Sequence, residues 1–360
     1  MHFRRVCLEA FGYTLPDEVV STSELERRLA PLYERLRLPE GRLELMTGIG
    51  ERRFFPPGTR PSAISIESAR RAIEASGIDA RYIGALLHGS VCRDFLEPAT
   101  ACRVHHGLEL PNEAMIYDVS NACLGLLNGM VQVASMIELG QIRAGVVVGT
   151  ECGRELVENT IALLNTDTSL TRDSVKDYIA SLTIGAASVA IVLCDEELSR
   201  TGNRLTTAVV HCDTSQHDLC QSRGLETIMR TDSEELLRRG IAAGANTFDR
   251  FLAAAGWEPG DIDRTFCHQV GVAHRKLLFE SLALDPAIDF ATLATLGNTG
   301  AAALPITMAL GIEQGRLRKD DRVAMLGIGS GINCLMLAVE WQKSPAILQQ
   351  NEPRTAEAAR

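Results

Sequence analysis

The stretch YDVSNACLGLLNGMVQVASMIELG, residues 117–140, decides the fold. An expected strand ends in it at Asn121, and a helical segment begins directly afterwards at Ala122 and Cys123. This segment carries no charge before Glu138, so it has no polar face to turn toward water. The sequence therefore predicts a strand that leads straight into a helix buried on all sides.

Around this stretch, short runs rich in Val, Ile and Leu alternate with amphipathic helical segments, which is typical of an α/β fold. The expected strands are 83–90, 114–121, 144–151, 187–195, 205–213, 264–271, 322–329 and 333–341. The expected helices include 62–77, 123–139, 233–256, 272–283 and 300–314.

The same order of elements occurs twice, with an offset of about 180 residues. In each half a helix leads to a strand, which ends at His88 in the first half and at His268 in the second. An apolar helix from Cys123, and a second one from Gly300, then precede another strand. Two similar halves that face each other would place equivalent loops at one shared site, so we expect a duplicated α/β fold.

The boundaries follow from this repeat. We expect a first half over residues 1–199, which contains Cys123, and a second half over residues 200–342, which contains His268 and Asn298. The polar segment 152–182 predicts an insertion that caps a site or contacts a partner subunit, and 343–360 predicts a mobile tail.

Composition narrows the class of protein. The chain has 360 residues, of which 46% are hydrophobic and 23% charged, as in ordinary globular enzymes. A net charge of −10 argues against nucleic acid as a partner, because phosphate binding needs clustered Lys and Arg. There is no apolar run of membrane-spanning length and no visible signal sequence, and the ten cysteines include no CxxC pair. We therefore expect a cytoplasmic protein with reduced, mostly packed thiols.

Cys123 is the candidate nucleophile. A thiol at the start of a helix meets the positive end of the helix dipole and unpaired backbone N–H groups, which lower its pKa and favour the thiolate. The helix also contains Gly125 and Gly129 and few charges, so it is expected to be a buried and rigid mount. The alternative is that Cys123 is one more packed cysteine.

His268 and Asn298 are the next candidates. His268 follows an apolar strand and precedes a helix, a junction where α/β proteins often place functional groups, although a structural histidine is the commoner case. His274 is a weaker competitor, expected on the surface of that helix. Asn298 lies in a Gly-flanked turn before a helix, where it could be a helix cap or an amide donor aimed at a carbonyl oxygen.

A Gly-rich turn, LGIGSGINC at 326–334, lies between two expected strands. It matches neither a nucleophile elbow nor a phosphate-binding loop. We expect it to bring backbone close to the site, so that Gly329, Ser330 or Gly331 presents an N–H to an oxyanion together with the N–H of Cys123.

No metal site is expected. Cys102, His105 and His106 cluster, but no second ligand group with suitable spacing follows them. The sequence identifies no cofactor-binding residue and calls for no cofactor.

The ordered set NAC at Cys123, HQV at His268 and GNTG at Asn298, closed by GIGSG, resembles the thiolase superfamily and its ketoacyl synthase III branch. The resemblance covers residues 1–342 and implies a five-layer αβαβα thiolase fold and a homodimer. The stretches SVCRDFLEPATA, DVSNACLGLLNGM and FCHQVGVAH are most similar to the subgroup of thiolases that opens long-chain olefin biosynthesis. Gly271 stands where fatty-acid initiating synthases have Asn, which argues against that function.

The resemblance implies catalytic roles for Cys123, His268, Asn298 and Glu97, the last supplied by the neighbouring subunit. It further implies condensation of two long-chain acyl-CoA molecules, without decarboxylation, to a 2-alkyl-3-ketoacid. CoA then enters only as part of the substrate, and a complex with downstream enzymes of the pathway is possible. A carboxylate in an apolar site suits removal of an α-proton, whereas Glu97 without this context would be a solvated surface residue.

Three alternatives remain open at this stage. Cys123 could instead join an acyl-CoA to a malonyl thioester with decarboxylation, with CoA or a carrier protein holding the acyl group. It could pass its acyl group to an alcohol, an amine or water. The chain could also be a non-catalytic partner of a heterodimeric synthase, although such partners usually lose the nucleophile.

Overall fold

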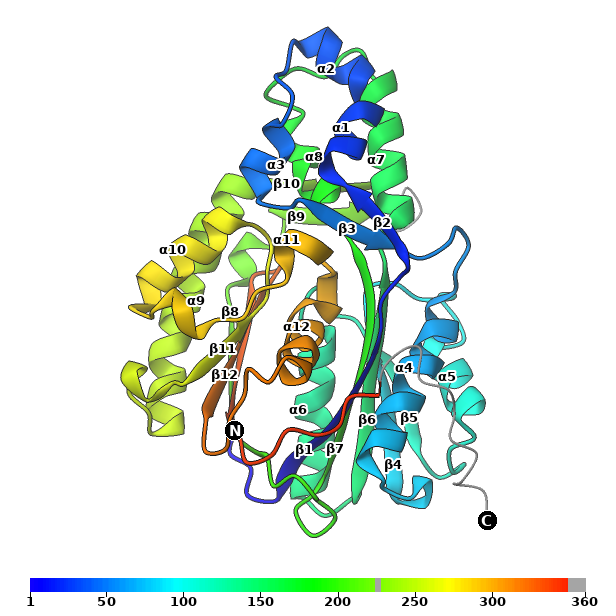
Figure 1. The fold of residues 1–360 in the computed structure, drawn as a ribbon, viewed down its shortest axis with the longest axis vertical. Coiled ribbons are helices and arrows are strands. Elements are labelled where there is room, and N and C mark those ends of the chain that lie inside the picture. The colour runs from blue at the N-terminus through cyan, green and yellow to red at the C-terminus, as the bar shows by residue number, and fades with distance from the viewer. Residues whose placement is uncertain (224–227, 349–360) are drawn as a thin grey trace.

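A computed structural model describes residues 1–223 and 228–348 (Figure 1). Its strands are β1 (Val6–Thr14), β2 (Glu18–Ser21), β3 (Glu51–Phe54), β4 (Ile83–Gly89), β5 (Met115–Val119), β6 (Ala144–Cys152), β7 (Ala186–Asp195), β8 (Arg204–Cys212), β9 (Cys220–Arg223), β10 (Ile228–Thr231), β11 (Arg264–Cys267), β12 (Arg322–Gly329) and β13 (Asn333–Glu340). Its α-helices are α1 (Thr22–Arg28), α2 (Ala30–Leu36), α3 (Arg42–Thr47), α4 (Pro61–Ser76), α5 (Thr100–Leu108), α6 (Gly125–Glu138), α7 (Arg154–Thr166), α8 (Lys176–Ile179), α9 (Ser233–Ala255), α10 (Val272–Leu282), α11 (Leu293–Leu296) and α12 (Ala303–Glu313). Short 3-10 helices are η1 (Ala80–Tyr82), η2 (Ala180–Thr183), η3 (Thr214–Gln216), η4 (Pro259–Asp261), η5 (Pro286–Ile288) and η6 (Gly300–Ala302).

The long strands form one continuous sheet in the order β11-β12-β13-β8-β1-β7-β6-β4-β5. Its two halves join where β1 meets β8, at the single registered pair of Cys7 and Arg204. Beyond this junction the halves diverge and face each other across α6 and α12, while α9 and α10 cover one outer face and α4 and α5 the other (Figure 1). The molecule thus has the five layers αβαβα that the resemblance implied.

Alternating side chains explain why each half-sheet needs helices on both faces. In β7, Val189 and Ile191 belong to the central core with α6 and α12, whereas Ala190 and Val192 belong to the outer core with α4. All four are buried. An apolar run without alternation is typical of strands covered on both faces, and it made these strands visible in the sequence.

The predicted duplication is present in the topology. The first half contributes strands in the order β1-β7-β6-β4-β5, and the second contributes β8-β13-β12-β11 in the matching order. At the place of β5, the second half has an isolated parallel bridge between Thr265 and Asp289. Both halves therefore have the same architecture, although the division of the chain at residue 200 stays a prediction.

The helices α1, α2 and α3 form a cap over one end of the sheets together with α7 and α8 (Figure 1). Leu25, Leu32 and Leu43 of α1 to α3 share a buried cluster with Ile161 of α7 and Leu182 of η2. The expected insertion 152–182 is therefore a helical element that packs against the N-terminal helices. None of the helices in the described ranges combines the length and apolarity needed to span a bilayer.

Candidate active site

Cys123 lies in a tight turn between β5 and α6 rather than in the helix itself. The N–H of Leu124 donates to the carbonyl of Asn121 at 2.9 Å, and Ala122 has a left-handed φ of 43°. The helix begins only at Gly125, so the predicted start at Ala122 and Cys123 is wrong by two to three residues. A residue other than glycine is strained in the left-handed conformation, and such residues are often found at functional sites.

A chain of amides, which no sequence motif predicted, holds this turn against the 329–333 hairpin. Asn121 donates from Nδ2 to Asn128 Oδ1 of α6 at 2.8 Å. Asn333 donates from Nδ2 to Asn121 Oδ1 at 3.1 Å and to the carbonyl of Ser330 at 3.0 Å. The two halves of the chain are thereby joined beside the thiol. Asn121 belongs to the quoted NAC motif, but only the fold shows its partners.

The thiol of Cys123 is neutral at physiological pH, contrary to the expectation of a lowered pKa. Burial, together with the nearby groups of Cys220 and Glu151, raises its pKa to about 12. The backbone N–H groups of Ser330 and Cys123 act in the opposite direction, because they favour the thiolate. Desolvation outweighs these donors because the sulfur lies ahead of the helix and among apolar layers.

His268 is a buried, neutral imidazole without a partner. It is 4% exposed, and neither Nδ1 nor Nε2 has a hydrogen-bond partner among the described residues. Burial, and secondarily His274, lowers its pKa to about 3. The strand β11 ends at Cys267, one residue before His268, whose N–H still donates to Leu326 of β12 at 3.1 Å. A neutral ring with free nitrogens can donate one hydrogen bond to a bound oxygen and accept one proton.

His274 was expected on the helix surface. It is instead half-buried in the first turn of α10. Burial lowers its pKa to about 4. Its effect on His268 shows that the two imidazoles are neighbours.

Asn298 is held with its amide nitrogen free. Its backbone bridges to the cap segment, since its N–H donates to Thr183 and its carbonyl accepts from Gly185, both at 2.9 Å. Its Oδ1 accepts from the N–H of Gly300 at 3.0 Å. This bond orients the amide, and in the described residues Nδ2 donates to no protein atom. Asn298 is therefore placed as a donor for a ligand and is not a cap of α12, which begins five residues later.

The Gly-rich turn lies against the thiol as expected. A Cβ added at Gly329 would lie 3.5 Å from Cβ of Cys123, so the two backbones are in contact. The N–H of Ser330 faces the sulfur. Two backbone N–H groups, of Cys123 and Ser330, thus converge on one position beside the sulfur, which is the arrangement of an oxyanion hole.

Glu97 lies apart from these groups within its own chain. It is exposed, and it makes no hydrogen bond or ion pair in the described part of the structure. It lies in the loop between β4 and α5, next to the exposed side chains Phe95 and Leu96. Within one chain the Gly329–Ser330 turn lies against Cys123, whereas the side chain of Glu97 is exposed.

A buried carboxylate that the sequence did not single out lies beside the thiol. Glu151, near the end of β6, is 6% exposed and is one of the groups that raise the pKa of Cys123. In the sequence, Glu151 is the last residue of the apolar run AGVVVGTE, and nothing in that run distinguishes it from an ordinary polar residue at the end of a strand. Its contacts with the backbone of distant segments exist only in the folded chain.

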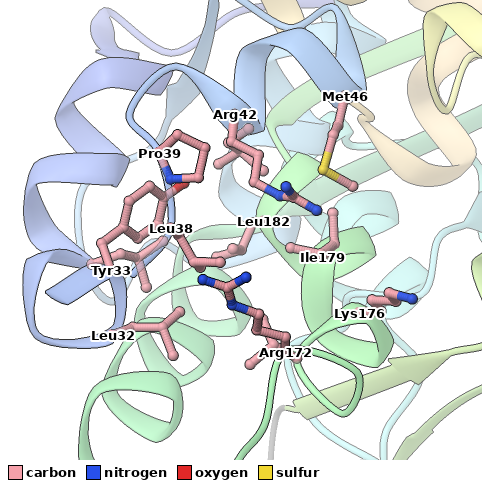
Figure 2. A pocket seen from close by; sticks show the side chains of 13 residues that line it. Leu32, Tyr33, Leu38, Pro39, Arg42, Met46, Arg172, Lys176, Ile179 and Leu182 are labelled. Atoms are coloured by element: carbon pink, nitrogen blue, oxygen red, sulfur yellow. The ribbon is translucent and has the colours of Figure 1, made fainter. Parts of the chain in front are cut away.

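A pocket of about 140 Å³ lies in the cap, between α1 to α3 and the segment of Arg172 to Leu182 (Figure 2). Its lining is mostly apolar, with Arg42, Arg172 and Lys176 among the lining residues. Nε of Arg172 donates a hydrogen bond to the carbonyl of Leu36 in α2, and Lys176 forms an ion pair with Asp173. Arg42 makes no ion pair with any described residue. Leu182 of the lining is adjacent to Thr183, which binds Asn298, so the pocket is close to the Asn298 turn.

No group of three His, Cys, Asp or Glu in the described ranges could hold a metal ion. His105 of the Cys102 cluster instead contacts the carbonyl of Pro111 through Nε2 at 3.0 Å.

Two family models match the chain. The thiolase N-terminal domain matches residues 45–153, and the C-terminal domain of 3-oxoacyl-[acyl-carrier-protein] synthase III matches residues 252–341. The first contains Cys123 and the second contains His268 and Asn298.

Full-length relatives match as well. The chain is 42% identical to the acyl-CoA:acyl-CoA alkyltransferase of Shewanella oneidensis, over 95% of this chain and 100% of that protein. It is 34% identical to the protein of the same name from Xanthomonas campestris pv. campestris, again over 95% and 100%. It is 26% identical to a beta-ketoacyl-[acyl-carrier-protein] synthase III of Roseiflexus castenholzii, over 93% and 97%.

The fold of this chain is also similar to solved structures of proteins from this group. A Cys-to-Ala variant of Xanthomonas campestris OleA superposes with a TM-score of 0.91 at 33% identity, covering 95% of this chain and 98% of that one. A Cys-to-Ser variant of the same protein, solved with bound lauric acid and lauroyl-CoA, superposes with a TM-score of 0.90 over 94% and 100%.

Proposed function

Because this chain belongs to the acyl-CoA:acyl-CoA alkyltransferase family of thiolase-fold acyltransferases, we propose that it joins two acyl-CoA molecules without decarboxylation, through an acyl group on Cys123. The observation that carries this proposal is the site itself. In it, two backbone N–H groups face the thiol of Cys123, the imidazole of His268 has no partner among the described residues, and a hydrogen bond from Gly300 orients the amide of Asn298.

The first step is acylation of Cys123. The sulfur attacks the carbonyl carbon of one acyl-CoA, and the N–H groups of Cys123 and Ser330 bind the oxyanion. The neutral ring of His268 is suited to accept the thiol proton, which the raised pKa of the thiol makes necessary. Collapse of the tetrahedral intermediate expels CoA, which takes up this proton, and leaves a thioester on Cys123.

The second step forms the carbon–carbon bond. The carbonyl oxygen of a second acyl-CoA binds the imidazole N–H of His268 and Nδ2 of Asn298, which stabilise the enolate once an α-proton is removed. Loss of one such donor typically lowers the rate by about 100- to 1000-fold. The α-carbon then attacks the Cys123 thioester and releases the sulfur. Hydrolysis of the remaining CoA thioester by water gives the 2-alkyl-3-ketoacid.

The α-proton needs a base, and Glu97 of a second subunit fits the requirement. The strand β5 is at the edge of the sheet, and its Met115 is 52% exposed. The adjoining loop exposes Val91 at 50% and Leu96 at 87%. An edge strand that pairs with no further strand among the described residues, and that is flanked by exposed apolar side chains, is suited to pair with another chain. Pairing of two copies through β5 would carry each Glu97 toward its partner's site.

The cap pocket is suited to the nucleotide end of CoA. An adenine can pack on its apolar lining, and the unpaired guanidinium of Arg42 can bind a phosphate (Figure 2). A CoA molecule bound there would direct its thioester toward the Asn298 turn. We place the enzyme in the cytoplasm, in olefin biosynthesis, where later enzymes that consume the ketoacid could bind it.

Product analysis tests this function. The purified protein is incubated with a panel of acyl-CoAs of different chain length, and products are identified by mass spectrometry. We expect one product carbon skeleton from two acyl chains. Release of labelled carbon dioxide from malonyl-CoA, coupled to product, would instead establish decarboxylative condensation. Simple transfer to water or an alcohol, without lengthening of the skeleton, would establish a hydrolase or acyltransferase.

Substitution of the proposed base separates the two steps. Glu97→Gln is expected to leave acylation of Cys123 intact and to lower condensation by about 100-fold or more, because proton abstraction loses its base. Glu113→Gln, an exposed acid before β5, is the matched control. Undiminished condensation in the Glu97 variant would mean that another group is the base.

A further inference from the structure

Glu151 binds two segments that are far apart in the sequence. Its Oε1 accepts hydrogen bonds from the backbone N–H groups of Val91 at 3.0 Å and Ala301 at 3.2 Å, and its Oε2 accepts one from Cys92 at 3.3 Å. These three donors are backbone groups and fix the main chain, and the thiol of Cys92 is a further partner of the carboxylate. One carboxylate therefore joins the loop after β4 to the turn before α12.

The carboxylate of Glu151 is buried and closely packed, so it is suited to hold these two segments rather than to bind solvent or a cation. The side chain is 6% exposed, and no cation forms a salt bridge with it among the described residues. A Cβ added at Gly300 would lie 3.1 Å from Cγ of Glu151, and Gly300 has a φ of 57°, so the turn packs closely onto the carboxylate. Burial raises the pKa of Glu151, while the N–H groups of Val91, Ala301 and Cys92, together with the thiol of Cys92, counteract that effect. A buried charge kept by three N–H donors stabilises one arrangement of the segments that supply them.

Both segments lead directly to proposed catalytic groups. Asn298 precedes the Gly300–Ala301 donor region, and its Oδ1 is bound by Gly300. The Val91–Cys92 segment is the base of the loop that carries Glu97. Farther along, this loop is held again at Asp94, which accepts from the N–H and hydroxyl of Ser62. The loop thus has a fixed base and an exposed tip.

We propose that Glu151 is a positioning residue that sets the loop of Glu97 and the turn of Asn298 relative to each other. Through one carboxylate, each subunit would orient the amide of its own site and the base that it supplies to its partner. This proposal rests on the proposed function, because it takes Glu97 as a base acting across the dimer.

The substitution Glu151→Gln tests the charge while keeping the shape. An amide can accept hydrogen bonds only through its oxygen, so its NH₂ group would face a backbone N–H of either Cys92 or the Val91 and Ala301 pair. At least one segment loses its partner and shifts. Displacement of a reacting group by about 1 Å typically costs on the order of 100-fold in rate.

The expected result is a split between the two steps. In Glu151→Gln, the single-turnover release of CoA on acylation of Cys123 should stay within about threefold of the wild type, while condensation should fall by about 10- to 100-fold. The matched control is Glu155→Gln, an exposed acid in α7, which should change neither step. Equal loss of both steps with a lowered melting temperature would show a merely structural role and overturn the proposal. So would unchanged condensation.

A second readout reports on the charge itself. Because Glu151 is one of the groups that raise the pKa of Cys123, its neutral replacement should shift the pH dependence of Cys123 alkylation to lower pH. The shift reports the lost charge when the melting temperature is unchanged, since loosened packing would also lower the pKa of the buried thiol. An unchanged alkylation profile would contradict the proposed placement of the charge.

Mixed dimers, made by co-expression of differently tagged chains, locate the effect. One dimer pairs wild type with a chain that carries both Glu151→Gln and Cys123→Ala, so that the only active site receives Glu97 from the altered chain. Its reference pairs wild type with Cys123→Ala alone. We expect lower condensation in the first dimer, and equal activity would overturn the proposed effect on the partner. A wild type that fails to join two acyl-CoAs would instead reject the proposed function and leave the alkylation result standing.

Discussion

The thiol of Cys123 shows how opposing local effects decide the chemistry of one residue. Two backbone N–H groups favour its thiolate, and burial beside Cys220 and Glu151 favours the neutral form. Burial is the larger effect, so the free enzyme holds a protonated nucleophile. The residue type and its position in the NAC motif could be read from the sequence. Its protonation state could not, because that depends on groups from three distant segments.

The pH dependence of Cys123 alkylation follows from this balance. Because burial raises the thiol pKa to about 12, the thiolate is the minor species at pH 7 and its fraction increases with pH. Reaction with iodoacetamide should therefore accelerate about tenfold per pH unit between about pH 7 and 10. The label is followed by mass spectrometry on the peptide that contains Cys123, with Cys123→Ser as the background. A rate that is already constant below pH 8 would indicate a lowered pKa and contradict this balance.

At the scale of elements, apolar runs predicted the eight strands from β4 onward that belong to the large sheet, and the helices α4, α6, α9, α10 and α12. They missed β1, which is central in the sheet, because its run VCLEAFGYT is interrupted by Glu9. This carboxylate is 2% exposed and accepts hydrogen bonds from Ser199, Arg200 and Thr201. They also missed the cap helices, because α1, α2, α3 and α8 have only four to seven residues and α7 lies in a segment that was interpreted as a polar insertion. Buried charge that is satisfied by distant backbone cannot be read from a local pattern.

The close packing of α6 onto the sheet can be tested at Gly129. A Cβ added there would lie 2.6 Å from Cγ1 of Val147 in β6. Both α6 and β6 are buried at this point, so neither can move away easily. Gly129→Ala should therefore lower the free energy of unfolding by about 1–3 kcal/mol through overpacking, despite the better helix propensity of Ala. Urea denaturation measures the effect. Gly260→Ala, where an added Cβ meets nothing within 4 Å, is the control and should be nearly neutral.

A stability equal to that of the wild type in the Gly129 variant would mean that α6 can move away from β6. Since Cys123 lies directly before α6, its acylation rate should then also tolerate the change.

At the scale of the whole molecule, the sequence predicted the ordered set of Cys123, His268 and Asn298 and the duplicated layers that bring their loops together. It did not predict the contacts that join the halves at the site, such as Asn333 with Asn121 or Glu151 with Ala301. Each of these bonds links segments more than a hundred residues apart, and only the closed fold brings them within reach. A site shared by two halves can thus be located from its motifs, but not assembled from them.

The proposed dimer provides the last prediction, because one chain alone leaves Glu97 outside its own site. Leu96 is 87% exposed beside Glu97, next to the uncovered edge of β5. If a second copy covers it, Leu96→Glu should weaken dimerisation by about 10- to 100-fold, since burial of a Leu side chain contributes roughly 1.5–3 kcal/mol and a charge must be desolvated as well. Analytical ultracentrifugation over a concentration series measures this change.

Activity should follow association in a specific way. The Leu96 variant at low concentration should still acylate Cys123, because the thiol, Ser330 and His268 come from one chain, but it should lose condensation until higher concentration restores the dimer. Leu139→Glu is the control, because Leu139 is 73% exposed at the far end of α6 and should affect neither property. Condensation that persists in the dissociated variant would place the base within the same chain, and an unaltered dimer would place the interface elsewhere on the molecule.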